Sequence, residues 1–275
     1  MLFGNSTRTH CATPVVGLAS AIFGKSKRDS SELIHLPAPV TRVKPGDMPR
    51  TARIAPGGII YHILNRAVGK STLFRGKRDY DAFQRCLIRT LEISPMRVPA
   101  YCIMSNHWHL VLWPRDDGEL AKFMLRLTIT HARRWLIHRK QVGTGHLYQG
   151  RYKSFATQDG PHLSTVCRYV ERNAVRAGLV RRSEEWPWSS GGQNMLDAEL
   201  RLTLEKHPAL ARADWREWVN RPQTAAEEAV LSRSIRESRP FGDEDWLRTT
   251  GKKLGWREPM KRGRPRKKKR PDGEK

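Results

Sequence analysis

The 275-residue chain lacks long apolar runs and has few cysteines. No apolar run approaches the roughly 18 residues of a membrane-spanning helix, and no basic amphipathic helix offers an apolar face, so no membrane contact is expected. The four cysteines form no Cys-x-x-Cys pair and are widely scattered, at Cys11, Cys86, Cys102 and Cys167. This spacing argues against a disulfide framework or a zinc finger and indicates buried thiols in a reducing compartment.

Acidic residues are also scarce. The chain has 27 Asp and Glu against 51 Lys and Arg, which gives a formal net charge of +24. Such an excess favours a polyanionic partner, and nucleic acid is the commonest polyanion for a soluble protein. We therefore expect a cytoplasmic, nucleoid-associated protein, although charge alone indicates binding and no particular chemistry.

Composition divides the chain into four parts. Residues 1–47 mix small, polar and proline residues without periodicity, and we expect a disordered N-terminal extension there. Residues 48–192 carry the strand and helix patterns of one domain, which the apolar content can supply with a core. Residues 193–258 contain short helical patterns with few large apolar residues, which predicts a small helical accessory region. Residues 259–275 form a basic tail.

The patterns within residues 48–192 predict an α+β fold. Strands are expected over 59–64, 100–104, 107–113 and 151–155, and helices over 77–93, 119–139 and 161–177, where Gly178 ends the last helix. Ser105-Asn106 is a tight-turn dipeptide, so the second and third strands should form an antiparallel hairpin. We expect an antiparallel sheet with helices on one face. His131 and His138 lie among basic residues of the second helix and should face solvent or phosphate.

Two histidines of the predicted hairpin project to one side. His107 and His109 are two residues apart, and residues i and i+2 of a strand share a sheet face. Two imidazoles on one face make half of a metal site. So short a pattern could equally be the solvated end of a strand. His62, in the first predicted strand, is expected to be structural or to face DNA rather than to bind metal.

The last predicted helix supplies two further polar groups. Tyr169 and Asn173 are four residues apart and therefore share a helix face. If that face meets the two histidines, the imidazoles and the Asn173 oxygen could hold a divalent cation, and Tyr169 could attack a phosphodiester. This donor set suits Mg²⁺ or Mn²⁺, and no third His, Cys or well-spaced carboxylate supports a zinc hydrolase. Taken singly, Tyr169 could be a half-buried core residue and Asn173 a solvated one.

Four segments of the chain, in order, carry a resemblance. They are Asn106–His109, Gly145–Ser154, Tyr169–Val180 and Trp186–Ser190. The ordered set resembles the REP-associated tyrosine transposases, relatives of the single-tyrosine HUH transposases of bacterial insertion sequences. The resemblance covers roughly residues 48–190. It implies a ferredoxin-like HUH core, and metal-dependent cleavage and rejoining of single-stranded DNA near a hairpin through a 5′-phosphotyrosine and a free 3′-hydroxyl.

The resemblance also assigns roles. It assigns the family's two metal histidines to His107 and His109. It assigns the third metal ligand to Asn173 and the nucleophile to Tyr169. Many members have proline after the asparagine, where this sequence has Ala174, which leaves the ligands intact but bears on the local helix geometry. Tyr148 ranks second as nucleophile, because no amide side chain follows it at i+4. The resemblance favours a monomer, in which one chain supplies the whole site.

Basic residues near this set are expected to contact DNA phosphates. Arg151 and Lys153 lie two apart on the predicted strand, and Arg176 lies two helical turns beyond Tyr169. The tail contains an AT-hook-like core, in which glycine permits close approach and arginines enter the minor groove of A·T-rich duplex DNA: Arg262, Gly263, Arg264, Pro265 and Arg266. The alternative is a basic tail that binds any polyanion through counterion release.

The sequence thus predicts a transposase or DNA nickase that acts on hairpin-containing single-stranded DNA through Tyr169. One rival is a non-catalytic binder of structured single-stranded DNA or RNA, which would not need the phenol, both imidazoles and the amide. The other is a metallohydrolase that activates water at His107 and His109. It would cleave without a covalent adduct.

Overall fold

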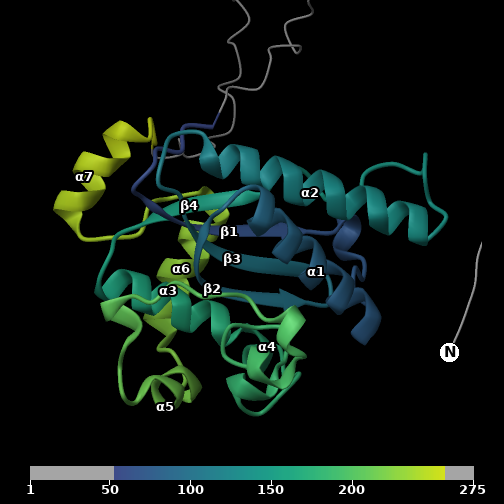
Figure 1. Ribbon diagram of the computed structural model, residues 1–275. Helices are drawn as coiled ribbons and strands as arrows, with labels where there is room; N and C mark the ends of the chain where they lie inside the picture. Colours follow the sequence, from purple (N-terminus) through teal and green to yellow (C-terminus); the bar gives the residue numbers. More distant parts are fainter. Residues whose placement is uncertain (1–52, 258–275) are drawn as a thin grey trace, which may run out of the picture. The chain divides into compact units, whose positions relative to one another are not determined.

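The fold is built on a four-stranded antiparallel sheet (Figure 1). The structure, a computed structural model, describes residues 53–257. The strand order is β2-β3-β1-β4, and the strands are β1 (Ile60–Arg66), β2 (Arg97–Met104), β3 (His107–Trp113) and β4 (Lys153–Thr157). Helix α1 (Lys77–Ile93) links β1 to β2, and α2 (Glu119–His138) links β3 to β4. This β-α-β-β-α-β order is ferredoxin-like. The predicted α+β fold is therefore confirmed.

Most element boundaries agree with the periodicity of the sequence. The hairpin of β2 and β3 turns at Ser105-Asn106 as predicted, and α1 has the predicted bounds. Strand β4 begins at Lys153, so the expectation that Arg151 lies in that strand is wrong. Strand β2 starts three residues early and passes Pro99 through an irregular register between Arg97 and Ala100.

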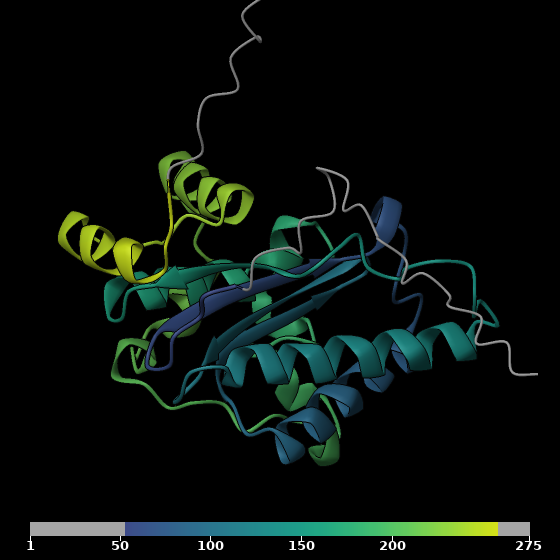
Figure 2. The same ribbon diagram turned by 90° about the horizontal axis from the view of Figure 1, so that it is seen from above.

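Helices cover both faces of the sheet, contrary to the expected single face (Figure 2). The reason is that both faces are apolar and each needs a cover. One face, which includes Ile63 and Leu110, packs against α1 and α2. The other, which includes Val111 and Phe155, packs against α3 (Pro161–Glu171).

The last core helix has an interruption. After α3, Arg172 separates it from the short helix α4 (Asn173–Arg176). Arg172 keeps helical dihedral angles (φ −79°, ψ −6°), so α4 continues α3 locally. Ala174, where many family members have proline, is buried within α4. Gly178 follows at φ 69°, in the left-handed region that ends helices, as predicted.

The segment Trp186–Ser190 lies along the outer edge of β2. Backbone N–H groups of Ile103 and Ser190 donate to the carbonyls of Trp188 and Tyr101, each at 2.9 Å. These bonds satisfy part of an edge strand that would otherwise expose its polar backbone. The motif therefore has a structural position at the edge of the sheet.

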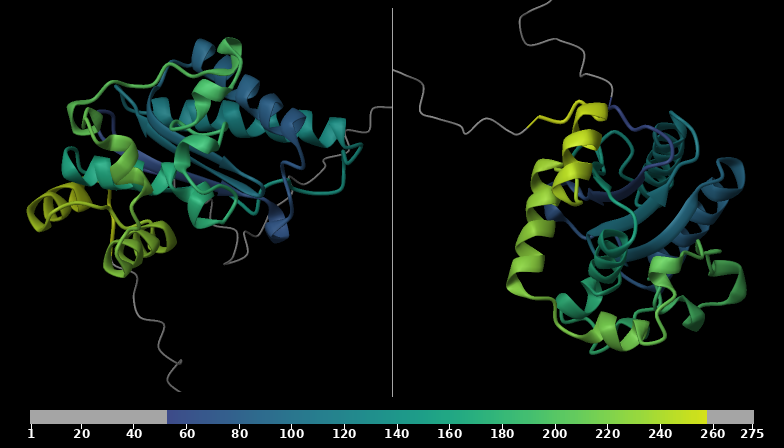
Figure 3. Two further views of the ribbon diagram at one scale, coloured as in Figure 1. Left: turned by 90° about the horizontal axis from the view of Figure 1, so that it is seen from below. Right: turned by 90° about the vertical axis from the view of Figure 1, so that its left-hand side faces the viewer.

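The C-terminal helices follow this segment. They are α5 (Trp215–Asn220), α6 (Ala225–Glu237) and α7 (Glu244–Lys253), and Figure 3 shows α6 and α7 on the side of the sheet away from α1. Leu231 of α6 is buried in the core beneath α3, and the Phe241 N–H donates to the Ala156 carbonyl at 2.8 Å. Short 3-10 turns occur at Val68–Lys70, Ser183–Glu185, Gln193–Met195, Ala198–Leu200 and Pro208–Leu210.

Helix α2 buries a histidine that was predicted to face solvent or phosphate. His131 is 5% exposed, and its Nδ1 lies 2.6 Å from the Tyr148 hydroxyl. The Trp108 indole N–H donates to the same hydroxyl at 3.1 Å. This pairing explains the burial, which lowers the pKa of His131 to about 3. The expectation for His131 is wrong, whereas His138 is exposed as predicted.

Several sequence predictions can be placed only in part. Cys86, Cys102 and Cys167 are buried free thiols, as expected. Cys11, the N-terminal extension 1–47 and the AT-hook-like residues 262–266 lie outside the described residues.

Within residues 53–257, no helix has both the length and the apolar character needed to cross a bilayer.

Candidate functional site

The two histidines of the His-x-His pattern lie on the sheet face covered by α3. In the antiparallel register, His109 is opposite Leu64 and His107 is opposite Arg66. The turn before them is held by the Leu73 N–H, which donates to the Ser105 carbonyl at 2.8 Å. His109 is 2% exposed, whereas His107 is half-buried at the start of β3. The strand thus presents one deep and one accessible imidazole.

Tyr169 lies beside these histidines. Helix α3 packs its apolar side on this face, and Tyr169, 5% exposed, comes with it. Its ring centroid is 6.0 Å from that of His109 and 6.2 Å from that of His62, edge-on in both cases. The predicted juxtaposition of the phenol with the His-x-His pattern is present in the structure.

Arg176 connects the tyrosine with the asparagine. Its Nη2 donates to the Tyr169 hydroxyl at 2.9 Å and to the Asn173 Oδ1 at 3.0 Å. Its guanidinium carbon also lies 4.4 Å from the centroid of the Tyr169 ring. The Asn173 amide N–H donates to the Tyr169 carbonyl at 2.9 Å, which directs the amide oxygen toward Arg176. Arg176, predicted to contact phosphate, here holds the phenol and the amide oxygen together.

The two imidazoles are in the charge state that metal ligation needs. Burial, assisted by the nearby charges of Arg66 and Arg176, lowers the pKa of His107 to about 4. Burial, with smaller contributions from the neighbouring imidazoles and from Arg176 and Arg66, holds the pKa of His109 well below 6.5. Both rings are therefore neutral near pH 7, as metal ligands must be.

One ring atom lacks a partner. The Nε2 of His109 is buried without any hydrogen-bond partner, and buried polar atoms are almost always paired. A cation at this nitrogen would satisfy it. Across residues 53–257 no three His, Cys, Asp or Glu side chains are grouped to hold a metal, so an ion here would also need an amide oxygen such as Asn173 Oδ1.

Sequence reasoning did not place three residues beside the two histidines, and it had expected His62 to be structural or to face DNA. The His62 Nε2 lies 2.8 Å from the His109 Nδ1, and the Asn106 Oδ1 lies 2.6 Å from the His107 Nδ1. Arg66 sits opposite His107, with its Nε buried and unpaired. Period-two alternation places His62 and Arg66 on one face of β1. Only the pairing of β1 with β3 shows that this face of β1 is the sheet face that carries His107 and His109.

Tyr148 is not near the site. It is 8% exposed and lies on the opposite side of the sheet, where its hydroxyl contacts His131 and Trp108. Burial also raises the pKa of Tyr148 far above its ordinary value, which opposes ionisation. The structure does not bring this second candidate nucleophile together with the histidines.

The two basic residues predicted for the last strand, Arg151 and Lys153, lie in different positions. Lys153 is exposed and stands opposite Leu64, so it lies on the same sheet face as His109. Arg151 is exposed in the loop before β4. Of the two, the sheet register relates only Lys153 to the histidine face.

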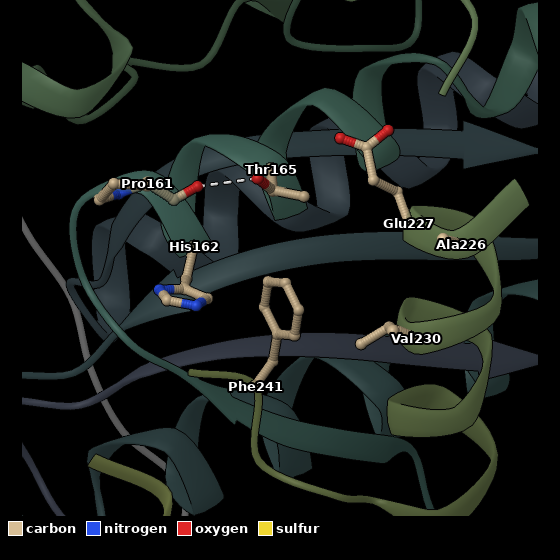
Figure 4. Close-up of a pocket in the computed structure, with 7 residues that line it drawn as sticks. All are labelled: Pro161, His162, Thr165, Ala226, Glu227, Val230 and Phe241. Carbon is tan, nitrogen blue, oxygen red and sulfur yellow. Dashed lines mark hydrogen bonds between the residues drawn. The ribbon is translucent and has the colours of Figure 1, made fainter. Parts of the chain in front are cut away.

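A separate cavity lies between the start of α3 and α6 (Figure 4). It has a volume of about 330 Å³ and is lined by Pro161, His162, Thr165, Ala226, Glu227, Val230 and Phe241. None of the histidine, tyrosine or asparagine residues described above contributes to it. It is not part of the candidate site.

Comparison with known proteins supports a family. Residues 57–173 match the family model "Transposase IS200 like". The match begins just before β1 and ends at Asn173, so it includes the His-x-His pattern and Tyr169. This stretch of the chain is similar to the transposases of that family. The resemblance carried by the ordered sequence motifs is confirmed.

Individual proteins are similar to this chain at low sequence identity. A Haemophilus influenzae protein named as a REP-associated tyrosine transposase is 26% identical over 122 residues, which span 41% of this chain and 69% of that protein. A solved REP-associated tyrosine transposase bound to a REP hairpin is 17% identical with a TM-score of 0.43, over 59% of this chain and 96% of that one. A Deinococcus radiodurans protein described as a transposase is 18% identical with a TM-score of 0.32, over 46% and 95%.

Proposed function

We propose that this domain cleaves and rejoins single-stranded DNA with Tyr169 as the nucleophile. The observation that carries the proposal is the position of the Tyr169 ring, 6.0 Å from His109 on the same sheet face, with its hydroxyl held by Arg176. A core tyrosine without a chemical role would need neither neighbour. The match of residues 57–173 to the transposase family model supports the same reaction class.

The chemistry is a transesterification. The Tyr169 oxygen attacks a backbone phosphorus, a bond from that oxygen to phosphorus forms, and the bond from phosphorus to the 3′-oxygen breaks. The phenol proton ends, by way of solvent, on the 3′-hydroxyl. The covalent 5′-phosphotyrosine conserves the ester, so a 3′-hydroxyl can later reverse the step and rejoin DNA.

Arg176 suits both directions of this reaction. The Tyr169 oxygen carries negative charge when it attacks and again when it leaves. That oxygen lies 2.9 Å from a guanidinium nitrogen of Arg176. A preorganised cationic donor at that distance stabilises developing charge with little reorganisation. The same side chain holds Asn173, so the two proposed functional groups of this helix are positioned by one residue.

A divalent cation, Mg²⁺ or Mn²⁺, completes the proposed site. His107, the unpaired Nε2 of His109 and the Oδ1 of Asn173 would hold it. An amide oxygen has two lone pairs, so accepting one hydrogen bond from Arg176 leaves one for the metal. When bound, the cation would polarise the scissile phosphate and offset its charge.

For the substrate we propose single-stranded DNA that contains a hairpin, the class expected from the family. Arg66 and Lys153 border the histidine face and would contact backbone phosphates, which position a strand without reading its bases. Arg151 and the basic tail around Arg264 would extend this contact. The chain's net charge of +24 supports polyanion binding in general.

The test is a covalent-adduct assay. Purified full-length chain is mixed with labelled hairpin DNA and Mn²⁺, and denaturing gels compare wild type with Tyr169→Phe and Tyr148→Phe. We expect a metal-dependent protein–DNA band that Tyr169→Phe abolishes and Tyr148→Phe retains, with hairpin binding unchanged in both. Nicking that persists in Tyr169→Phe without an adduct would favour the water-using metallohydrolase. Binding without cleavage in wild type would favour the non-catalytic binder.

A further inference from the structure

His62 is a buried histidine that the reaction above does not use. It lies on β1, is 1% exposed, and is enclosed by the Phe155 ring at 4.8 Å and the Tyr169 ring at 6.2 Å between centroids. Its polar contact is with another imidazole, the His109 Nδ1, at 2.8 Å from its Nε2. A buried imidazole pair beside a nucleophile needs an explanation.

Both rings of the pair are buried, and one hydrogen bond of 2.8 Å joins the His62 Nε2 to the His109 Nδ1. A hydrogen bond between two neutral imidazoles needs one N–H and one bare nitrogen. If His109 donates from Nδ1, its Nε2 carries a free lone pair. If His62 donates instead, the His109 Nε2 carries a proton and cannot bind a metal.

The surroundings favour the first arrangement. In the second, the His109 Nε2–H would be a buried donor with no acceptor, since no hydrogen-bond partner lies near that nitrogen. A buried polar nitrogen without a partner is unfavourable, and a cation can satisfy a bare nitrogen but not an N–H. In the first arrangement the His109 Nε2 has no proton, and its lone pair can bind a cation. Ligating histidines almost always hold their other ring nitrogen in such an outer bond.

The accessible histidine has a parallel arrangement. The Asn106 Oδ1 lies 2.6 Å from the His107 Nδ1, and the Asn106 amide N–H donates to the Lys70 carbonyl at 3.2 Å. The second bond orients the amide, so its oxygen, which only accepts, faces the ring. His107 therefore carries its proton on Nδ1. Both histidines then have Nδ1 occupied by a neighbour and Nε2 left for a ligand.

We propose that His62 is a positioning residue that accepts the His109 Nδ1 proton and so presents the Nε2 lone pair of His109 to a divalent cation. The inference rests on the proposed function, because it assumes that the cation binds at His107 and His109. His62 itself touches neither cation nor DNA in this proposal. It acts through His109.

Metal affinity tests the proposal without any need for activity. The full-length chain is titrated with Mn²⁺, and free Mn²⁺ is measured by electron paramagnetic resonance for wild type and three variants. His62→Phe keeps a ring but removes the acceptor, and we expect Mn²⁺ affinity to fall by about 10–100-fold. His62→Gln can place an amide oxygen near the same position and should retain most of the affinity. His131→Phe, a buried histidine on the other sheet face, is the matched control and should bind as wild type does.

The outcomes separate the two proposals. Equal Mn²⁺ affinity in wild type and His62→Phe would overturn the role of His62 alone. An equal loss in His131→Phe would also overturn it, because general destabilisation would then explain the effect. Failure of wild type to bind Mn²⁺ would overturn the proposed metal site and this inference together. If His62→Phe does not fold, ¹⁵N shifts of the wild-type His109 ring decide: a protonated Nδ1 supports the proposal and a protonated Nε2 refutes it.

Discussion

At the scale of single residues, the candidate site depends on how charge is placed around one phenol. Arg176 donates to the Tyr169 hydroxyl and the Asn173 amide oxygen, and it also lies over the Tyr169 ring. Losing this side chain removes both the positive charge beside the nucleophile and the orientation of the amide.

Replacing Arg176 should therefore reduce covalent chemistry more than binding. In Arg176→Met we expect the rate of adduct formation on saturating hairpin DNA to fall by about 10²-fold, the usual effect of removing a donor to developing charge. Arg176→Lys keeps the charge but loses the planar fork, and it should be intermediate. The measurement is single-turnover adduct formation on denaturing gels.

The control for this variant changes charge equally but elsewhere. Arg126 is exposed on α2, which covers the opposite face of the sheet. Arg126→Met should form adduct at the wild-type rate. A rate for Arg176→Met equal to that of Arg126→Met would contradict the assigned role of Arg176.

At the scale of elements, the helix that carries Tyr169 is tied to the segment that covers β2. The Glu171 carboxylate accepts from the Ser190 hydroxyl at 2.7 Å and from the Trp215 indole at 2.9 Å. Burial raises the pKa of Glu171. The path of the chain after Ser190 therefore bears on how α3 is held against the sheet.

Two adjacent glycines on that path allow a matched stability test. A Cβ at Gly192 would lie 2.0 Å from the Trp186 carbonyl oxygen, whereas one at Gly191 would meet nothing closer than 3.6 Å. We expect Gly192→Ala to lower the free energy of unfolding by about 1–3 kcal/mol or more, because backbone atoms must shift. Gly191→Ala should change it by about 0.5 kcal/mol or less. Urea denaturation of both variants checks this, and equal midpoints would show that the segment adapts freely.

At the scale of the whole molecule, positive charge exceeds what the site itself uses. The chain carries 51 Lys and Arg, and a dense run of them lies between residues 261 and 270, outside the described residues. Such a run binds polyanions mainly by releasing counterions. Its contribution should therefore appear in affinity and salt dependence, and not in the chemical step.

Deleting residues 261–275 should separate these two properties. We expect weaker hairpin binding and a shallower slope of log affinity against log salt concentration, because fewer phosphates are neutralised. Adduct formation on a short, saturating hairpin should be unchanged. Fluorescence anisotropy at several salt concentrations provides the measurement, with a neutral tail of equal length as control. Unchanged affinity and slope would contradict any DNA-binding role for the tail, AT-hook-like or not.

The sequence alone determined the local part of this protein. Spacings of two in a strand and four in a helix put His107 with His109 and Tyr169 with Asn173, because local backbone geometry decides which neighbours share a face. The same periodicities predicted the helices and strands to within a few residues. Motif order indicated the family.

Only the tertiary structure decided which faces meet. The register of β1 with β3 put His62 and Arg66 beside the histidines, and the burial of Tyr148 beneath α2 removed it from the site. The direction of the Arg176 side chain likewise depends on packing between α3, α4 and the sheet. These are contacts between residues far apart in sequence or around a helix interruption. Local spacing carries no information about them, because strand pairing and core packing select among the faces that local geometry leaves open.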